Sequence, residues 1–422
     1  MLAPILSALG DAAAAFDEAH PGFSGVRRPV HVVYGGADRF KADTAAKLGG
    51  LAAKAFSARM PDAEALARVT GMDSALALRV RPRVAAKLAG TAVEDFRIDF
   101  EDGYGPRRDA EEDAHAHGAA LETAEGLKRA SLPPFLGLRV KALSREHAVR
   151  AARTLDVYLS TLLAATRGDL PANFVVTLPK VAFPEQVLAL ADLLERIERG
   201  HALQAGTIKI ELMLETPQAL VSPDGAVAPR ILVAAARGRC VSMHLGPFDM
   251  TASLEVDAGA QRLDHPANAW ALRLAAAALG GTGVALCDGP VAILPLGEDP
   301  AAVDAALGLH YRQVRRALSE GVHRGWDLHP AQLPTRYAAL YAHYLENLDA
   351  AATRLKRFLD GAAKAVSAGT VFDDAATGQG LLNFFLRGLE CGALTPEEAA
   401  ASGLTKEDLA LKSFAHILAR RV

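Results

Sequence analysis

The chain has 422 residues, of which 50% are hydrophobic and 23% are charged, as in ordinary soluble globular proteins. This length allows one large domain and an appendage. A formal net charge of −3 gives no electrostatic reason to expect nucleic acid or an anionic membrane as partner. The three cysteines are far apart and form no C-x-x-C pair, so they suggest neither a thiolate zinc site nor a disulfide framework, and a reducing cytoplasm is the simplest location.

The first 29 residues predict a helical extension rather than a targeting segment. They are apolar at the start but carry no Lys or Arg before Arg27, and Asp11 interrupts the apolar run, so we do not expect a signal peptide. The richest apolar stretch, Leu274 to Cys287, is short and full of Gly and Ala, so it does not predict a membrane span.

Eight short aliphatic or β-branched runs follow, separated by longer segments with helical spacing. Several runs are apolar on both faces, which is typical of parallel strands covered by helices. The predicted strands are His31–Tyr34, Phe96–Phe100, Phe135–Val140, Phe174–Leu178, Ile208–Leu214, Cys240–Leu245, Gly283–Leu286 and Trp326–Leu328. Eight strand–helix units predict a (β/α)₈ TIM barrel over residues 30–333, with more than one helix between Lys41 and Asp95. A doubly wound open sheet is the alternative.

Residues 334–422 predict a C-terminal domain made of helices only. Thr395-Pro396-Glu397-Glu398 combines a cap, a proline and a capping-box Glu, and Thr405 begins a weaker signal of the same kind. Gly280 to Gly283 lacks the Lys-Ser/Thr of a phosphate-binding loop, so it predicts a turn.

Polar residues gather where the predicted strands stop, which in a barrel is the catalytic face. Glu215 ends the fifth strand, and Thr216-Pro217 provides an N-cap and a first helical position. Several carboxylates at one barrel mouth would repel one another, and a hard divalent cation would offset that repulsion. Mg²⁺ keeps several waters, so two protein carboxylates suffice. We expect Glu215 and Asp249 to be the metal ligands, because they follow successive strands.

The remaining candidates have competing interpretations. Asp99 and Glu101 share one face of the second strand and Asp102 the other, and the three are either functional or a solvated loop paired with Arg107 and Arg108. Arg139, after the third strand, is either a functional charge or a structural ion pair. His115 and His117 lie in a predicted surface helix (Asp109 to Leu127) and are expected to be solvated, not zinc ligands. The residues expected to bind substrate are Asp38, Arg39, Lys180, Gly246, Pro247 and His329, although a histidine placed like His329 is more often structural.

Six fragments in order resemble the HpcH/HpaI aldolase and citrate lyase β-subunit family, which includes malyl-CoA and citramalyl-CoA lyases. The fragments cover roughly residues 30 to 333. They are Asp99-Phe100-Glu101-Asp102 (D-L-E-D in the family), Arg139-Val140-Lys141 (R-x-N), Leu178-Pro179-Lys180 (L-P-K), Glu215-Thr216-Pro217 (E-T-x), Gly246-Pro247-Phe248-Asp249 (G-x-x-D) and Leu328-His329-Pro330-Ala331-Gln332 (I-H-P-x-Q).

The resemblance implies a Mg²⁺-containing barrel, with Mn²⁺ as a substitute, that assembles as a homo-trimer or homo-hexamer. Glu215 and Asp249 would ligate the metal, and Asp99, Glu101 and Asp102 would orient metal-bound waters or tune charge. Arg139 would bind the oxygen that becomes enolate-like. Asp374, or its neighbour Asp373, would be the acid/base by resemblance to related lyases and malate synthases, although an N-cap pair at a helix start is the more ordinary interpretation.

Three functions compete at this point. The first is a carbon–carbon lyase or synthase acting on a hydroxy acid or its CoA ester, with a keto acid such as pyruvate, oxaloacetate or glyoxylate as partner. The second is a class II aldolase acting on free hydroxy-keto acids without CoA. The third is a barrel that has lost catalysis and serves binding or regulation, which we rank last because the carboxylates and Arg139 are all present.

Overall fold

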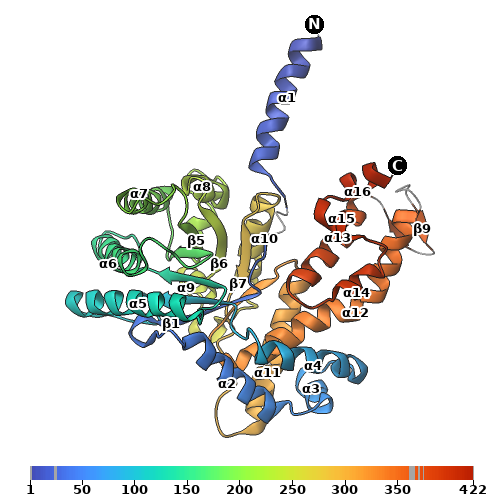
Figure 1. Cartoon of the computed structure of the whole chain (residues 1–422), viewed down its shortest axis with the longest axis horizontal. Helices are drawn as coiled ribbons and strands as arrows, with labels where there is room; N and C mark the ends of the chain where they lie inside the picture. The colour runs from blue at the N-terminus through green and yellow to red at the C-terminus, as the bar shows by residue number, and fades with distance from the viewer. Residues whose placement is uncertain (1, 23–25, 361–365, 369–370, 374, 422) are drawn as a thin grey trace.

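A computed structural model describes residues 2–22, 26–360, 366–368, 371–373 and 375–421 of the chain. Eight parallel strands form a closed barrel in the order β1 to β8, and β8 pairs with β1 to complete it (Figure 1). The strands are β1 His31–Gly36, β2 Asp95–Asp99, β3 Phe135–Arg139, β4 Phe174–Leu178, β5 Lys209–Leu214, β6 Cys240–Leu245, β7 Ala285–Asp288 and β8 Arg324–Asp327. The predicted (β/α)₈ barrel and all eight strands are therefore confirmed, with ends that differ by up to two residues.

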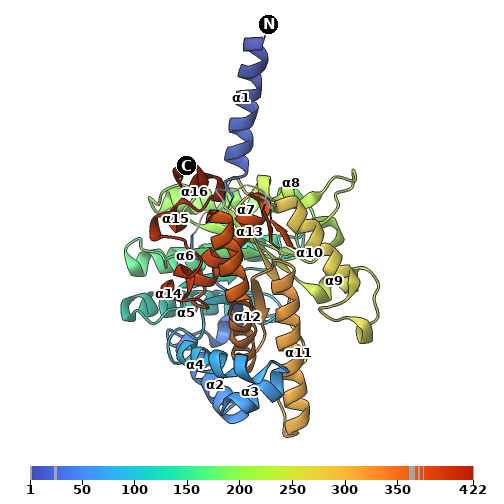
Figure 2. The ribbon, with the colours of Figure 1, turned by 90° about the vertical axis from the view of Figure 1, so that its right-hand side faces the viewer.

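Helices connect successive strands and cover the outside of the barrel (Figures 1 and 2). Three of them, α2, α3 and α4, fill the long first connection, as expected. The connecting helices are α2 Thr44–Arg59, α3 Ala63–Thr70, α4 Ser74–Ala89, α5 Asp109–Arg129, α6 Ala148–Thr166, α7 Pro184–Gly200, α8 Ala228–Ala235, α9 Pro247–Ser253, α10 Pro266–Leu279 and α11 Pro300–Ser319, with the short 3-10 helices η1 Ala37–Arg39, η2 Pro217–Ala219, η3 Ala258–Ala260 and η4 Pro330–Gln332.

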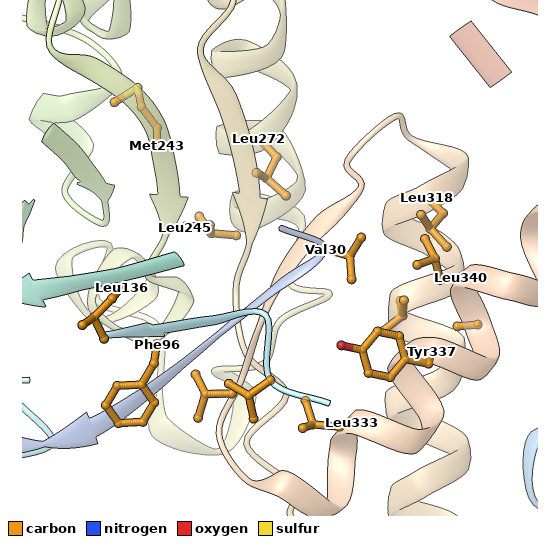
Figure 3. Packing of buried hydrophobic residues seen from close by; sticks show 14 of the residues in the cluster. Val30, Phe96, Leu136, Met243, Leu245, Leu272, Leu318, Leu333, Tyr337 and Leu340 are labelled. Carbon is orange, nitrogen blue, oxygen red and sulfur yellow. The ribbon is translucent and has the colours of Figure 1, made fainter. Parts of the chain in front are cut away.

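The hydrophobic core lies between the strands and these helices. Phe96 and Leu136 project from neighbouring strands, while Tyr337 and Leu340 of α12 (Leu333–Asp360) lie near Val30 at the start of β1 (Figure 3). All are buried, and the Tyr337 hydroxyl donates a 2.8 Å hydrogen bond to the Ala92 carbonyl, which satisfies its polar end. The helix α12 therefore ties β1 and β2 to the C-terminal part of the chain.

The amino-terminal half of the barrel interior is filled by charged side chains instead of the branched aliphatic residues that usually fill it. Arg97 Nη2 lies 2.7 Å from Glu211 Oε2, and Arg324 Nη1 lies 2.8 Å from Glu211 Oε1. Both arginines also pair with Asp95. Two buried cations thus face two buried carboxylates, an arrangement whose desolvation cost is offset only by close pairing.

The C-terminal region is mainly helical, with one departure from expectation. Its helices are α12, α13 Ala375–Glu390, α14 Pro396–Ala400, α15 Lys406–Leu411 and α16 Phe414–Arg421. Between α12 and α13, however, the short strands β9 (Val366–Ala368) and β10 (Val371–Asp373) pair antiparallel, so the prediction of helices only was wrong here. The valines and Phe372 in this segment favour extended backbone. The domain boundary at residue 333 stays a prediction, because α12 contacts both α4 and α13.

The first helix, α1 (Leu2–Ala19), extends away from the rest of the molecule (Figures 1 and 2). Its apolar side chains Ile5, Leu6, Leu9 and Phe16 are each about 60% exposed. Within the described part of the chain, no helix combines the length and apolar character needed to cross a membrane.

Candidate active site and metal centre

The carboxyl ends of β2 to β6 bring together the acidic and basic residues singled out in the sequence. Glu215 directly follows β5 and is 1% exposed. Its Oε1 accepts a 2.6 Å hydrogen bond from the backbone N–H of Lys180. The predicted junction is present behind it: Thr216 caps η2 by accepting from the Ala219 N–H at 3.1 Å, and Pro217 begins that helix. This anchored turn fixes the Glu215 backbone at the barrel mouth.

Asp249 reaches the same place from the next strand, in the first turn of α9. Gly246 makes the approach possible, because a Cβ at this position would lie 2.6 Å from the Glu215 Cβ and closer still to its Oε2. Burial, together with the negative charge of Asp249, raises the pKa of Glu215 to about 7. The two carboxylates are therefore close enough to repel each other.

Lys180 lies between the carboxylates of three strands. Its Nζ is 2.5 Å from Glu101 Oε1 and 3.6 Å from Asp249 Oδ1, and its backbone has φ of 50°, in the left-handed region. Burial alone would lower the pKa of Lys180, but the bond to Glu101 and the charges of Glu215, Glu101 and Asp102 raise it above its ordinary value. One ammonium group thus balances several carboxylates at the mouth.

Arg139 and Asp99 form a buried bidentate pair. Arg139 Nε and Nη2 donate to Asp99 Oδ1 and Oδ2 at 2.7 and 2.6 Å, and the two side chains are 2% and 0% exposed. The Asp99 oxygens also accept from the backbone N–H groups of Glu101 and Gly103. These four hydrogen bonds use the acceptor positions of the Asp99 carboxylate, which orients Arg139. Asp99 therefore has little remaining capacity to orient a metal-bound water.

Glu101 and Asp102 follow β2 instead of continuing it, so the expected alternation of faces does not apply to them. Both contact Arg139: its Nη1 lies 3.1 Å from Glu101 Oε2 and 3.6 Å from Asp102 Oδ2. Burial raises the pKa of Glu101. Burial would also raise that of Asp102, but its hydrogen bond with Glu101 and the charges of Arg139 and Lys180 lower it. The alternative pairing with Arg107 and Arg108 is not the one adopted, since Arg107 pairs with Asp38 and Glu111.

Two aromatic residues that the sequence analysis did not single out complete the surroundings of Arg139. The guanidinium carbon lies 4.9 Å from the Tyr34 ring centroid and 5.5 Å from that of Trp326, and the two rings are 4.3 Å apart. Arg139 Nη1 and Trp326 Nε1 are both buried without a hydrogen-bond partner among the described residues. Tyr34 ends the first predicted strand, a position that could have identified it, whereas Trp326 begins the eighth predicted strand and carried no such signal.

The other expected substrate-binding residues have mainly local roles. His329 Nδ1 accepts from the Ala331 N–H at 3.1 Å and so caps η4, the structural role that its sequence context favoured. Pro247 is the first residue of α9 and is buried beneath Gly289. Asp38 and Arg39 end η1, where Asp38 lies near the Gly103 loop that follows β2.

Asp374 lies outside the described residues, so its acid/base role stays a prediction. The helix α13 begins at Ala375, and its residues Gln379, Asn383 and Arg387 line a cavity at the amino ends of the strands, which is the opposite end of the barrel from Glu215. The two histidines that were not expected to bind metal also lie away from the site, on α5, where His115 bonds to the Tyr104 hydroxyl and His117 to Thr161.

The donor set suits a hard cation with few protein ligands. No group of three or more His, Cys, Asp or Glu residues is arranged to hold a metal in the part of the chain that the structure describes. Glu215 and Asp249 nevertheless converge as oxygen donors, one of them in a buried position where its charge lacks full compensation. Mg²⁺ requires no more than two such carboxylates, because it retains waters in its octahedral shell.

Comparison with solved structures finds the same fold in citrate lyase-type proteins. A citrate lyase from Burkholderia xenovorans LB400 is 19% identical, with a TM-score of 0.61 over 92% of this chain and 99% of the other. CitE from Mycobacterium tuberculosis, solved with magnesium, acetoacetate and coenzyme A, is 18% identical, with a TM-score of 0.51 over 87% of this chain and 99% of the other. These likenesses support the resemblance at the level of fold.

The comparison with curated proteins gives no match. A scan against protein families matches residues 9–417, nearly the whole chain, to one family. The chain therefore belongs to the family described as Domain of unknown function (DUF6986).

Proposed function

We propose that this protein is a Mg²⁺-dependent carbon–carbon lyase or aldolase that forms or cleaves a bond next to a carboxylate. The substrate would be a hydroxy acid or its CoA ester, with a small keto acid as product or co-substrate. The observation that carries the proposal is the meeting of Glu215 and Asp249 around Lys180, beside the buried guanidinium of Arg139. The magnesium and coenzyme A of the CitE structure are in keeping with this chemistry.

Glu215 and Asp249 would hold the metal, which would supply Lewis-acid polarisation of a keto oxygen. Lys180 keeps the neighbouring carboxylates partly balanced and leaves Asp249, whose side chain is 41% exposed, open to incoming ligands. The three side chains thus supply the metal ligands and a balancing positive charge in positions that the fold already provides.

Arg139 would stabilise the negative oxygen that develops during the reaction. Its Nε and Nη2 are held by Asp99, whereas Nη1 makes no hydrogen bond among the described residues and contacts Glu101 Oε2, at 3.1 Å, as an ion pair only. Tyr34 and Trp326 pack against the guanidinium and restrict its motion, so the charge is positioned before the substrate arrives. The Trp326 Nε1–H, also without a described partner, is a second donor for a substrate carboxylate.

Metal binding provides the first test. The chain, treated with EDTA and then dialysed, is titrated with Mg²⁺ and Mn²⁺ by calorimetry in the presence of pyruvate or oxaloacetate. We expect one ion per chain, and affinity losses of about tenfold or more in Glu215→Gln and Asp249→Asn. Glu185→Gln, at an exposed position on α7, is the matched control and should bind as the wild type does. Unchanged affinity in both site variants would contradict the proposal.

Turnover provides the second test and separates the two enzyme classes. Malyl-CoA and citramalyl-CoA form one arm, and free 4-hydroxy-2-oxo acids form the other, with release of glyoxylate or pyruvate as the readout. We expect activity in one arm to disappear with EDTA and to return with Mg²⁺. Activity that persists fully in EDTA would refute metal dependence, and the absence of both metal binding and turnover would favour a non-catalytic barrel.

A further inference from the structure

A cavity of about 1020 Å³ lies at the end of the barrel opposite the proposed active site. Its floor is formed by residues near the amino ends of the strands, including Arg97, Glu211 and Arg324, and its walls include α13, which supplies Arg387. The lining also includes Ala276 and Leu279 of α10, a helix that faces the C-terminal helices in Figure 1. Neither the metal site nor the Arg139 pocket extends into it, because their residues lie at the carboxyl ends of the strands.

The lining of the cavity is strongly basic. Seven arginine and lysine residues line it against three carboxylates, an excess of four positive charges, although the chain as a whole carries −3. Two of those carboxylates, Asp95 and Glu211, already pair with Arg97 and Arg324. Positive charge in a partly enclosed space is costly unless anions offset it.

A second observation comes from Arg324 on the cavity floor. Its side chain is 6% exposed, and its Nη groups donate to Glu211, Ser242 and Asp95. Its Nε is buried and has no hydrogen-bond partner among the described residues. A buried N–H of this kind is normally satisfied, so a ligand or water is expected to accept from it.

Arg28 shows that the cations of the cavity act on one another. Burial first, and then repulsion from Arg387 and Arg324, lowers the pKa of Arg28. Its backbone N–H donates to Glu390 Oε1 at 2.5 Å, which fixes this segment against α13. The arginines of the barrel and those of the C-terminal helices therefore face one shared space.

We propose that this cavity binds a small organic anion, whose carboxylate or phosphate group lies among Arg28, Arg324 and Arg387. The apolar part of the lining, which includes Leu279 and Leu340, would contact the carbon skeleton of the ligand. Arginine suits carboxylate and phosphate equally through paired N–H donors, so the lining fixes the anionic group and leaves its source to experiment.

The occupied cavity would also be connected to the barrel mouth. Glu211 on the floor lies 3.2 Å from His244 Nε2, and His244 Nδ1 is 2.9 Å from the Tyr34 hydroxyl. The Tyr34 ring in turn packs on Arg139. A continuous series of polar and ring contacts therefore links the cavity floor to the proposed active site.

Calorimetry of the full, EDTA-treated chain in a HEPES buffer of low ionic strength tests the site. Inorganic phosphate and citrate are the probes, and glycerol is the uncharged control. We expect one equivalent of phosphate, of citrate or of both to bind, with affinity that falls when NaCl is added. Binding of phosphate alone would identify a phosphoryl ligand, and binding of citrate alone a polycarboxylate; either result supports the site.

Two variants locate the binding. Arg387→Gln is expected to weaken the probe by about tenfold or more, and Lys209→Gln, at the start of β5, to weaken it in the same direction. Arg196→Gln, at an exposed position on α7 outside the cavity, should have no effect. Glu215→Gln should also bind the probes normally, which separates this site from the proposed metal centre. Absence of probe binding to the wild type, or equal binding by all variants, would overturn the proposal.

Discussion

Replacement of Gly246 by alanine tests how Glu215 and Asp249 are brought together. The added Cβ would lie 2.6 Å from the Glu215 Cβ, whereas carbon atoms in contact are about 3.5–4.0 Å apart, so one of the two must move by about 1 Å. Rotation of the Glu215 side chain cannot relieve the clash, because its Cβ is fixed by the backbone. The backbone after β5 is in turn held by the Thr216 cap and by the bond from Lys180 to the Glu215 carboxylate.

Overpacking of this kind costs about 1–3 kcal/mol, and we expect Gly246→Ala to lower the free energy of unfolding by that amount. Urea unfolding followed by circular dichroism measures the loss. Calorimetric titration with Mg²⁺ is expected to show an affinity loss of about tenfold or more, because the displaced carboxylate no longer meets Asp249.

Gly118→Ala is the matched control. Gly118 lies within α5, and a Cβ there would meet nothing within 4 Å, so alanine should stabilise the helix by about 0.5–1 kcal/mol. If Gly246→Ala unfolds at the same urea concentration as the wild type, the tight approach of Gly246 to Glu215 is refuted. If it is destabilised but binds Mg²⁺ normally, the steric reasoning holds and the assignment of Glu215 as a ligand fails.

Three further changes probe other parts of the molecule. Arg139→Met leaves the buried carboxylate of Asp99 without its partner and should lower the free energy of unfolding by about 3–5 kcal/mol. The double variant that adds Asp99→Asn should recover part of this loss. A single variant as stable as the wild type would disprove the pairing. Burial first, and then the charge of Arg387, lowers the pKa of His323 to about 3 from an ordinary value of 6.5, so its stabilising effect is complete above pH 6.5 and is lost as the pH falls toward 3. This loss amounts to about 2 kcal/mol at pH 5, and unfolding of His323→Phe should therefore depend less on pH than that of the wild type; equal slopes would argue against a neutral native imidazole. Thr395→Ala removes the capping box of α14 and should lower the free energy of thermal or urea unfolding by about 1 kcal/mol. Thr395→Ser keeps the hydroxyl and should retain most of that stability. Equal losses in the two variants would exclude a hydroxyl cap.

Several features of the site could be predicted because they depend on neighbours in sequence. Thr216-Pro217 after an apolar run places Glu215 at the end of a strand, and parallel strands bring their carboxyl ends to one face. The approach of Asp249 to that face follows from the same rule. The proximity of the two carboxylates could therefore be predicted from the sequence, whereas the tightness of the approach, set by Gly246, could not.

The partners of the charged residues could not be predicted in the same way. Asp99 had Arg107 and Arg108 as near neighbours in sequence, yet it pairs with Arg139, forty positions away and on the adjacent strand. Glu101, after β2, reaches Lys180, after β4, across the end of β3. Such choices depend on strand register and on barrel closure, which no local pattern encodes.

The charged side chains inside the barrel show most clearly that ion-pair partners cannot be predicted from local sequence. Arg97 and Glu211 are 114 positions apart, and the sequence analysis assigned neither of them a partner. Closure of the barrel places them against each other and against Arg324, so that each charge has a partner.

The sequence by itself determined the alternation of strands and helices, the caps, and the kinds of side chain at the strand ends, because these depend on residues within a few positions of one another. Only the tertiary structure decided which charges pair, and that the C-terminal helices enclose a basic cavity at the amino ends of the strands. Those outcomes arise from packing between segments that are far apart in the sequence, by 40 positions for Asp99 and Arg139 and by 114 for Arg97 and Glu211, so buried charges must find partners in space and not along the chain.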